Sequence, residues 1–181
     1  MPINLPEYDL SLFTIPKCGG TTIWEWCYYI RTGESFSKSE KDGIYSQGWM
    51  RGGPLKKKLI VVRDPVDRFV SGYRNFRDKR GLNLDFDEFV KKFHWLYSTK
   101  DNYHHHFRPQ SSCVQHPLDH FDHVFHFSEY KMVRKFLESR TRMKLPNYHH
   151  QKSRHERPEI SQGHLRYIKS FYQQDYDAGF C

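Results

Sequence analysis

Short apolar runs recur along the chain and predict the strands of a sheet. Three of them stand out: residues 10–15 (LSLFTI), 59–63 (LIVVR) and 123–127 (HVFHF). The clearest is residues 59–63, with four apolar residues in a row, which is typical of a strand that is covered on both faces. A weaker strand is predicted over residues 43–47 (GIYSQ).

The polar and apolar positions after the first two runs have the spacing of amphipathic helices. After the first run, Thr21 or Thr22 is suited to open a helix and Gly33 to close it. After the second run, Asp64 is a suitable cap and Pro65 suits the first helical position. The chain therefore begins with two units of strand followed by helix.

The rest of the chain continues this alternation with longer polar segments between the elements. Helices are predicted over residues 85–93, over residues 128–140 with Ser128 as the cap, and over the closing residues 161–180. Residues 94–121 and 147–158 are rich in polar residues and are predicted as loops.

Alternating strands and helices predict an α/β fold with three layers, in which helices flank a central parallel sheet. The length of 181 residues favours a single domain over residues 1–181. Ligands of such sheets bind beyond the carboxyl ends of the strands. The turn at residues 16–20 and Arg63 both follow a predicted strand, so we expect them to share one site.

Composition indicates the charge of a binding partner but not its identity. Aromatic residues make up 17% of the chain, which is enough for a packed core, and the net charge is +8. This charge favours an anionic partner, such as a nucleotide, a nucleic acid, an acidic sugar or an anionic membrane.

The cysteines and the apolar runs exclude several classes of protein. The four cysteines form no C-x-x-C pair, which excludes a zinc ribbon and a disulfide-dense scaffold. No apolar run has the roughly 20 residues of a membrane span. The first ten residues lack the pattern of a signal peptide.

The segment FTIPKCGGTT, residues 13–22, has the composition of an anion-binding loop. Consecutive glycines let main-chain N–H groups line a concavity, and the following helix adds its positive end. Lys17 supplies a full charge, and Thr21 and Thr22 supply hydroxyl donors. The alternative is a plain turn between a strand and a helix, with Lys17 solvated.

The position of the lysine argues against ATP chemistry. In an ATP-binding loop the lysine follows the last glycine, whereas Lys17 precedes both Gly19 and Gly20. No convincing carboxylate follows a strand to hold Mg²⁺, and the strongest strand ends in Arg63. A site built from cations suits an anion whose transfer needs no metal.

Two segments resemble the nucleotide motifs of sulfotransferases. Residues 15–22 (IPKCGGTT) are similar to the 5′-phosphosulfate loop, and residues 61–76 (VVRDPVDRFVSGYRNF) are similar to the 3′-phosphate motif. Three more segments resemble the Golgi carbohydrate sulfotransferases of sulfotransferase family 2: residues 104–113 (HHHFRPQSSC), 121–130 (FDHVFHFSEY) and 171–180 (FYQQDYDAGF).

The resemblance implies a P-loop-like fold and transfer of a sulfuryl group from 3′-phosphoadenosine 5′-phosphosulfate (PAPS) to an acceptor hydroxyl, with release of 3′,5′-ADP (PAP). It implies a carbohydrate acceptor, with a tyrosine or a small molecule as the alternative. Arg63 and Ser71 are expected to bind the 3′-phosphate. The 5′-phosphosulfate is expected to be bound by Lys17, Cys18, Gly19, Gly20, Thr21 and Thr22.

A polar segment near the end of the chain is a candidate lid over the nucleotide. It contains Lys152, Ser153 and Arg154, and family members have a basic loop near this place. The alternative is an ordinary solvated loop.

The acceptor hydroxyl needs a general base, and histidine or glutamate are the usual choices. His106 is the first candidate, and His104 and His105 are adjacent alternatives. Glu40, together with Glu34, is the second choice. Lys17 is expected to meet the negative charge on the bridging oxygen. His105 and Arg108 are candidates for binding an anionic acceptor.

Other functions stay open at this stage. The spacing of His104, His106, Cys113 and His116 could suit zinc, but chance explains it as well in a chain with twelve histidines, and no metal is expected. A P-loop nucleotide kinase and a basic nucleic-acid-binding module are more distant alternatives. We expect a soluble chain, cytoplasmic if complete and from the Golgi lumen if cut from an anchored enzyme.

Overall fold

The computed structural model describes residues 2–35, 55–148 and 156–181. The chain forms two compact units. The sheet unit comprises Met1–Val62 and His116–His150, and the helical unit comprises Arg63–Gln115 and Gln151–Cys181.

The sheet unit contains a four-stranded sheet in the order β1-β2-β3-β4. β2 (Leu10–Phe13), β3 (Lys57–Val62) and β4 (His123–His126) are parallel, and β1 (Pro2–Leu5) is antiparallel to β2. This mostly parallel sheet confirms the predicted α/β class and the three predicted strands.

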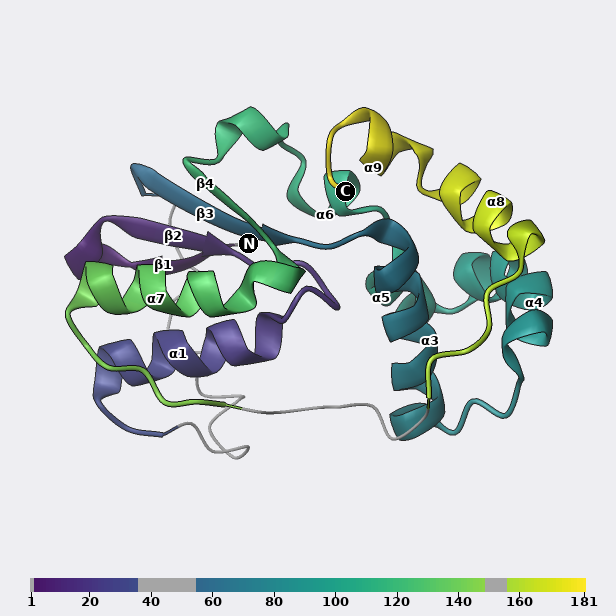
Figure 1. Ribbon diagram of the computed structural model, residues 1–181, viewed down its shortest axis with the longest axis horizontal. Helices are drawn as coiled ribbons and strands as arrows, with labels where there is room; N and C mark the ends of the chain where they lie inside the picture. Colours follow the sequence, from purple (N-terminus) through teal and green to yellow (C-terminus); the bar gives the residue numbers. More distant parts are fainter. Residues whose placement is uncertain (1, 36–54, 149–155) are drawn as a thin grey trace. The chain divides into compact units, whose positions relative to one another are not determined.

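Helices α1 (Gly20–Thr32) and α7 (Tyr130–Thr141) lie side by side over one face of the sheet (Figure 1). The apolar residues of this layer belong to one buried cluster, which includes Leu12, Leu59 and Val61 from the strands, Ile23, Trp26 and Cys27 from α1, and Val133 and Leu137 from α7. The predicted helices that follow the first and third strands are therefore present, and they cover the sheet as an α/β fold requires.

The opposite face of the sheet is also buried. Ser11 Oγ donates to Asn4 Oδ1 at 2.6 Å, and the main-chain N–H of Leu55 donates to Ser11 Oγ at 2.7 Å. The ring of Phe13 packs edge-on against Phe121 with centroids 5.0 Å apart. Burial on both faces explains why β3 ends in the continuous apolar run of residues 59–62.

The helical unit is built around aromatic rings. Its helices are α3 (Pro65–Arg80), α4 (Phe86–Thr99), α5 (Asp101–Phe107), α6 (Gln110–Val114), α8 (Gln162–Phe171) and α9 (Gln173–Asp177). The fully buried ring of Phe69 contacts Phe93 at 4.8 Å and Phe107 at 5.3 Å between centroids. A Cβ on Gly72 would lie 2.5 Å from the Phe107 ring, so glycine permits α3 to approach α5 closely.

Helix caps were predicted well at the start of α3. Asp64 is its N-cap, and its side chain accepts a hydrogen bond from Asp67 N at 2.8 Å, with Pro65 in the first turn. Gly33 closes α1 with a φ of 76°. The helix predicted to begin at Ser128 instead begins at Tyr130, because residues 127–129 form a 3-10 turn capped by His126.

The prediction of a loop over residues 94–121 is wrong. α4 extends to Thr99, and α5, α6 and the 3-10 turn Leu118–His120 follow. The polar composition hid an apolar pair four residues apart, Tyr103 and Phe107, which packs α5 onto the aromatic core.

The short antiparallel strand β1 was not predicted. It carries Pro2 at its first position and lies at the edge of the sheet, where proline is tolerated. The strand predicted at residues 43–47 lies outside the described residues. Within the described part of the chain, no helix combines the length and the hydropathy that crossing a bilayer requires.

Candidate functional site

The glycine turn has an unusual main-chain conformation directly after β2. Lys17 has a φ of 71° and Gly19 a φ of 78°, while Cys18 between them has a negative φ. Alternation between left-handed and right-handed residues turns successive N–H groups toward one concave side, which is the geometry of an anion-binding nest. A left-handed lysine costs about 1 kcal/mol, and strain of this kind is typical of functional sites.

Helix α1 begins immediately after this turn. Ile23 N donates to Gly19 O at 3.2 Å, which is the i to i−4 bond that starts the helix. The N–H groups of Gly20, Thr21 and Thr22 precede that bond, at the positive end of a 13-residue helix. Lys17 and these residues are neither fully buried nor fully exposed, so the cradle is open to a ligand.

Tyr130, the first residue of α7, holds the turn in place. Its hydroxyl donates to Gly19 O at 2.6 Å, and its ring stacks on Trp26 with centroids 5.2 Å apart. Burial raises the pKa of Tyr130 well above its usual value, so the hydroxyl stays a donor. A Cβ on Gly19 would lie 2.4 Å from the Tyr130 ring. The sequence analysis quoted segment 121–130 but gave Tyr130 no role.

Arg63 follows β3 by one peptide bond, and its main chain is held by a glutamine far along the sequence. Arg63 N donates to Gln110 Oε1 at 3.0 Å, and Gln110 Nε2 donates to Arg63 O at 2.8 Å and to Phe180 O at 2.9 Å. Gln110 is fully buried.

A buried carboxylate fixes Gln110 in turn. Asp175 Oδ2 accepts from Gln110 N at 2.8 Å, and Asp175 Oδ1 accepts from Ser111 N at 2.9 Å and Ser111 Oγ at 2.8 Å. Gln110 and Asp175 come from segments 104–113 and 171–180, which the sequence analysis quoted without explaining why they occur together. The network around Arg63 supplies that explanation.

A buried cation, Arg68, stabilises the same unit. Its Nη2 donates to Arg108 O at 2.8 Å and to His106 O at 3.3 Å, and its guanidinium lies 5.7 Å from the centroid of the Tyr172 ring. Only 1% of Arg68 is exposed. Sequence reasoning missed this residue, because a buried arginine has no signal in the local pattern.

Ser71 lies on α3 and is partly buried. It follows the N-cap Asp64 by seven positions, which is close to two helical turns, so both occupy one side of the helix. The structure therefore supports the spacing argument for Ser71, and its role stays a prediction.

The histidine candidates and Arg108 lie on or next to α5. The His106 ring packs edge-on against Phe76 at 5.5 Å, and the His104 ring lies 5.0 Å from that of Tyr97. Phe76 is about 16 Å along the axis of α3 from Pro65, so His106 lies beside the carboxyl-terminal half of that helix.

Cations surround the exposed His105. Desolvation lowers its pKa, and Arg108, Arg80 and His104 lower it further. Arg108 Nε contacts Cys113 Sγ at 3.2 Å. This positive surface is suited to an anionic molecule.

Several candidates lie outside the described residues: Glu40, Lys152, Ser153 and Arg154. Glu34 is described and exposed, directly after the Gly33 cap of α1. Among the described residues, no group of three or more His, Cys, Asp or Glu side chains could hold a metal ion.

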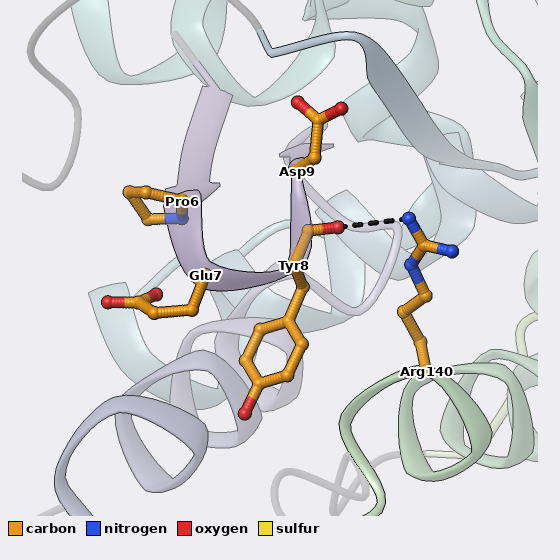
Figure 2. Close-up of a pocket in the computed structure, with 5 residues that line it drawn as sticks. All are labelled: Pro6, Glu7, Tyr8, Asp9 and Arg140. Carbon is orange, nitrogen blue, oxygen red and sulfur yellow. Dashed lines mark hydrogen bonds between the residues drawn. The ribbon is translucent and has the colours of Figure 1, made fainter.

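Two hollows lined by described residues lie away from the glycine turn. Figure 2 shows one of them, where Pro6, Glu7, Tyr8 and Asp9 surround the bond from Arg140 Nη2 to Tyr8 O. This hollow precedes β2, so it lies at the opposite end of that strand from the turn. The other is in the helical unit and is lined by Phe76, Arg80, Leu96, Lys100, Asn102 and Tyr103.

Comparison with protein families gives a match over nearly the whole chain. A family model described as "Sulfotransferase family" matches residues 3–178. No curated protein and no solved structure matches the chain.

Tyr130 clamps the glycine turn, through its hydrogen bond to Gly19 O and its ring against Gly19. Substitution of Gly19 should therefore lower stability much more than substitution of Gly20. Gly19→Ala forces a side chain into the Tyr130 ring at a positive φ, and should lower the free energy of unfolding by about 3 kcal/mol. Gly20→Ala is the matched control, because its Cβ would have no neighbour closer than 3.6 Å. Urea denaturation measures both. Equal stabilities of the two variants would contradict the clamp.

Proposed function

Because the chain belongs to the sulfotransferase family, an enzyme family that transfers a sulfuryl group to an acceptor hydroxyl, we propose that its donor is PAPS and its acceptor a carbohydrate. The observation that carries the donor proposal is the glycine turn, with its left-handed Lys17 and Gly19 at the start of α1. The other steps build on it.

The turn fits the 5′-phosphosulfate end of PAPS. Main-chain N–H groups from the turn and from the first residues of α1 bind oxygens, and no side chain at Gly19 or Gly20 blocks their approach. Lys17 adds a positive charge, and the hydroxyls of Thr21 and Thr22 add donors. Cys18 is buried and contributes only its main chain to the cradle.

Arg63 and Ser71 are proposed to bind the 3′-phosphate. A guanidinium offers two parallel N–H donors to phosphate oxygens, and a serine hydroxyl adds a third donor. β2 and β3 are parallel neighbours, with Phe13 paired to Ile60, so both strands end at one edge of the sheet. Arg63 is bonded to the last residue of β3, so the glycine turn and Arg63 follow strands that end at the same edge.

The chemistry follows from these assignments. The acceptor oxygen forms a bond to sulfur, the bond from sulfur to the bridging oxygen breaks, and the electron pair stays on PAP. Lys17 and the main-chain N–H groups stabilise the charge that develops on that oxygen. The acceptor proton passes to a general base, for which His106 stays the first prediction and His104 and Glu40 the alternatives. Lys152, Ser153 and Arg154 are proposed to cover the nucleotide.

The surface of the helical unit supports a carbohydrate acceptor, and an acidic one. Trp95 is 58% exposed, and Lys100 Nζ lies 5.8 Å from the centroid of its ring. Arg80 lies over Phe76 at 5.4 Å beside Tyr103, and none of the described residues that line their hollow is a carboxylate. Aromatic faces suit sugar rings and cations suit carboxylates or sulfates. His105 and Arg108 are proposed to extend this surface.

Donor binding can be tested by thermal unfolding with and without nucleotide. PAP should raise the unfolding temperature without Mg²⁺, by an amount that grows with the logarithm of its concentration. Lys17→Ala and Arg63→Ala should each reduce this rise, and Lys91→Ala, in an exposed pair with Asp87, should not. A preference for ATP with Mg²⁺ would support a kinase instead. A response to nucleic acid alone, lost at high salt, would support a nucleic-acid-binding module.

The acceptor can be tested by transfer of ³⁵S from PAPS to a panel of acidic glycans, neutral glycans, tyrosine peptides and phenols. We expect the acidic glycans to be labelled fastest, and Arg108→Ala to raise their KM about tenfold while PAP binding is kept. Faster labelling of tyrosine peptides or phenols would overturn the carbohydrate proposal and leave the donor proposal intact.

A further inference from the structure

Gln110 uses its side-chain amide to hold both main-chain polar groups of a single residue, Arg63. Its oxygen accepts from Arg63 N at 3.0 Å, and its nitrogen donates to Arg63 O at 2.8 Å. The N–H and C=O of one residue belong to two successive peptide groups, and one primary amide reaches both only when they point to the same side of an extended main chain. Gln110 therefore fixes the direction of the main chain at Arg63, just after β3.

The second hydrogen of the same amide reaches the end of the described chain. Gln110 Nε2 donates to Phe180 O at 2.9 Å, and both Gln110 and Phe180 are fully buried. No water competes for a buried amide, so each of these hydrogen bonds must be replaced if the glutamine is changed.

Asp175 prevents Gln110 from moving. Its two oxygens accept three hydrogen bonds from Gln110 N, Ser111 N and Ser111 Oγ. Bonds to a carboxylate are shorter and stronger than those between neutral groups. The link from Asp175 to Arg63 is thus continuous and lies within the helical unit.

We propose that Gln110, fixed by Asp175, is a positioning residue of the donor site, which orients Arg63 toward the 3′-phosphate. A long flexible side chain binds a phosphate more tightly when its main chain is already fixed, because less conformational entropy is lost on binding. Arg63 is fixed on one side by β3 and on the other by the Asp64 cap of α3. Gln110 fixes the peptide groups between these anchors. The inference rests on the proposed function, which assigns the 3′-phosphate to Arg63.

The test compares two nucleotides that differ only in the 3′-phosphate, PAP and 5′-AMP. Gln110→Glu keeps the size of the side chain and an oxygen for Arg63 N, and removes the donors to Arg63 O and Phe180 O. We expect the Kd for PAP to rise about tenfold or more and the Kd for 5′-AMP to change by less than about twofold. Titration calorimetry measures both constants.

Gln174→Glu is the matched control. It makes the same chemical change on the exposed side of α9, where Gln174 Nε2 donates to Ser112 Oγ at 3.3 Å. We expect it to leave both constants unchanged. Gln110→Met, which is neutral and similar in length, should reproduce the selective loss even if Gln110→Glu does not fold.

A double-mutant cycle separates positioning from general damage. In the background of Arg63→Ala, Gln110→Met should weaken PAP binding no further, because the group that it positions is gone. If the losses of PAP affinity from Arg63→Ala and Gln110→Met multiply in the double variant, the inference is overturned. An equal loss of affinity for PAP and for 5′-AMP would also overturn it. Wild-type protein that fails to prefer PAP over 5′-AMP would overturn the proposed function and this inference together. A wild-type preference that survives in both Gln110 variants would overturn this inference alone.

Discussion

The parallel pairing of β2 with β3 is the constraint on which the proposed donor site depends. Phe13 lies opposite Ile60, so the segments that follow the two strands leave the sheet at the same edge. One segment contains the left-handed residues Lys17 and Gly19, and the other begins with Arg63. In β2, Leu10 and Leu12 belong to the apolar cluster, and Ser11 between them is hydrogen-bonded to Asn4 and Leu55 N. A shift by one position would bring Ser11 into the apolar cluster, so this alternation fixes the register of β2 and the start of the segment that follows it.

Hydrogen bonds from distant parts of the sequence give these segments their shape. Tyr130 holds the glycine turn through Gly19 O, and Gln110 holds Arg63 through both of its main-chain groups. Neither Tyr130 nor Gln110 has to touch the nucleotide in this account. Each stabilises one main-chain conformation, and the conformation presents N–H groups or a guanidinium in a fixed direction. Preorganisation of this kind is what a site needs when its ligand is stabilised by electrostatics alone.

The sequence predicted those parts of the fold whose signals are local. Apolar runs identified β2, β3 and β4, and the Asp64–Pro65 pair identified the start of α3. Helices α5 and α6 were missed because their polar, histidine-rich residues carry only a short apolar stripe. The partners Tyr130 and Gln110 could not be predicted, since they lie 111 and 47 residues from the groups they bind. The resemblance identified segments 104–113 and 171–180, and the structure supplied their shared role around Arg63.

The most direct test of the central claim is a crystal structure of the protein with PAP. The account predicts the 5′-phosphate within hydrogen-bond distance of the main-chain N–H groups from Gly19 to Thr22, with Lys17 beside it. It predicts the 3′-phosphate of the same molecule against the Arg63 guanidinium and the Ser71 hydroxyl. A nucleotide that contacts only one of these two groups, or that binds at another place, would contradict it.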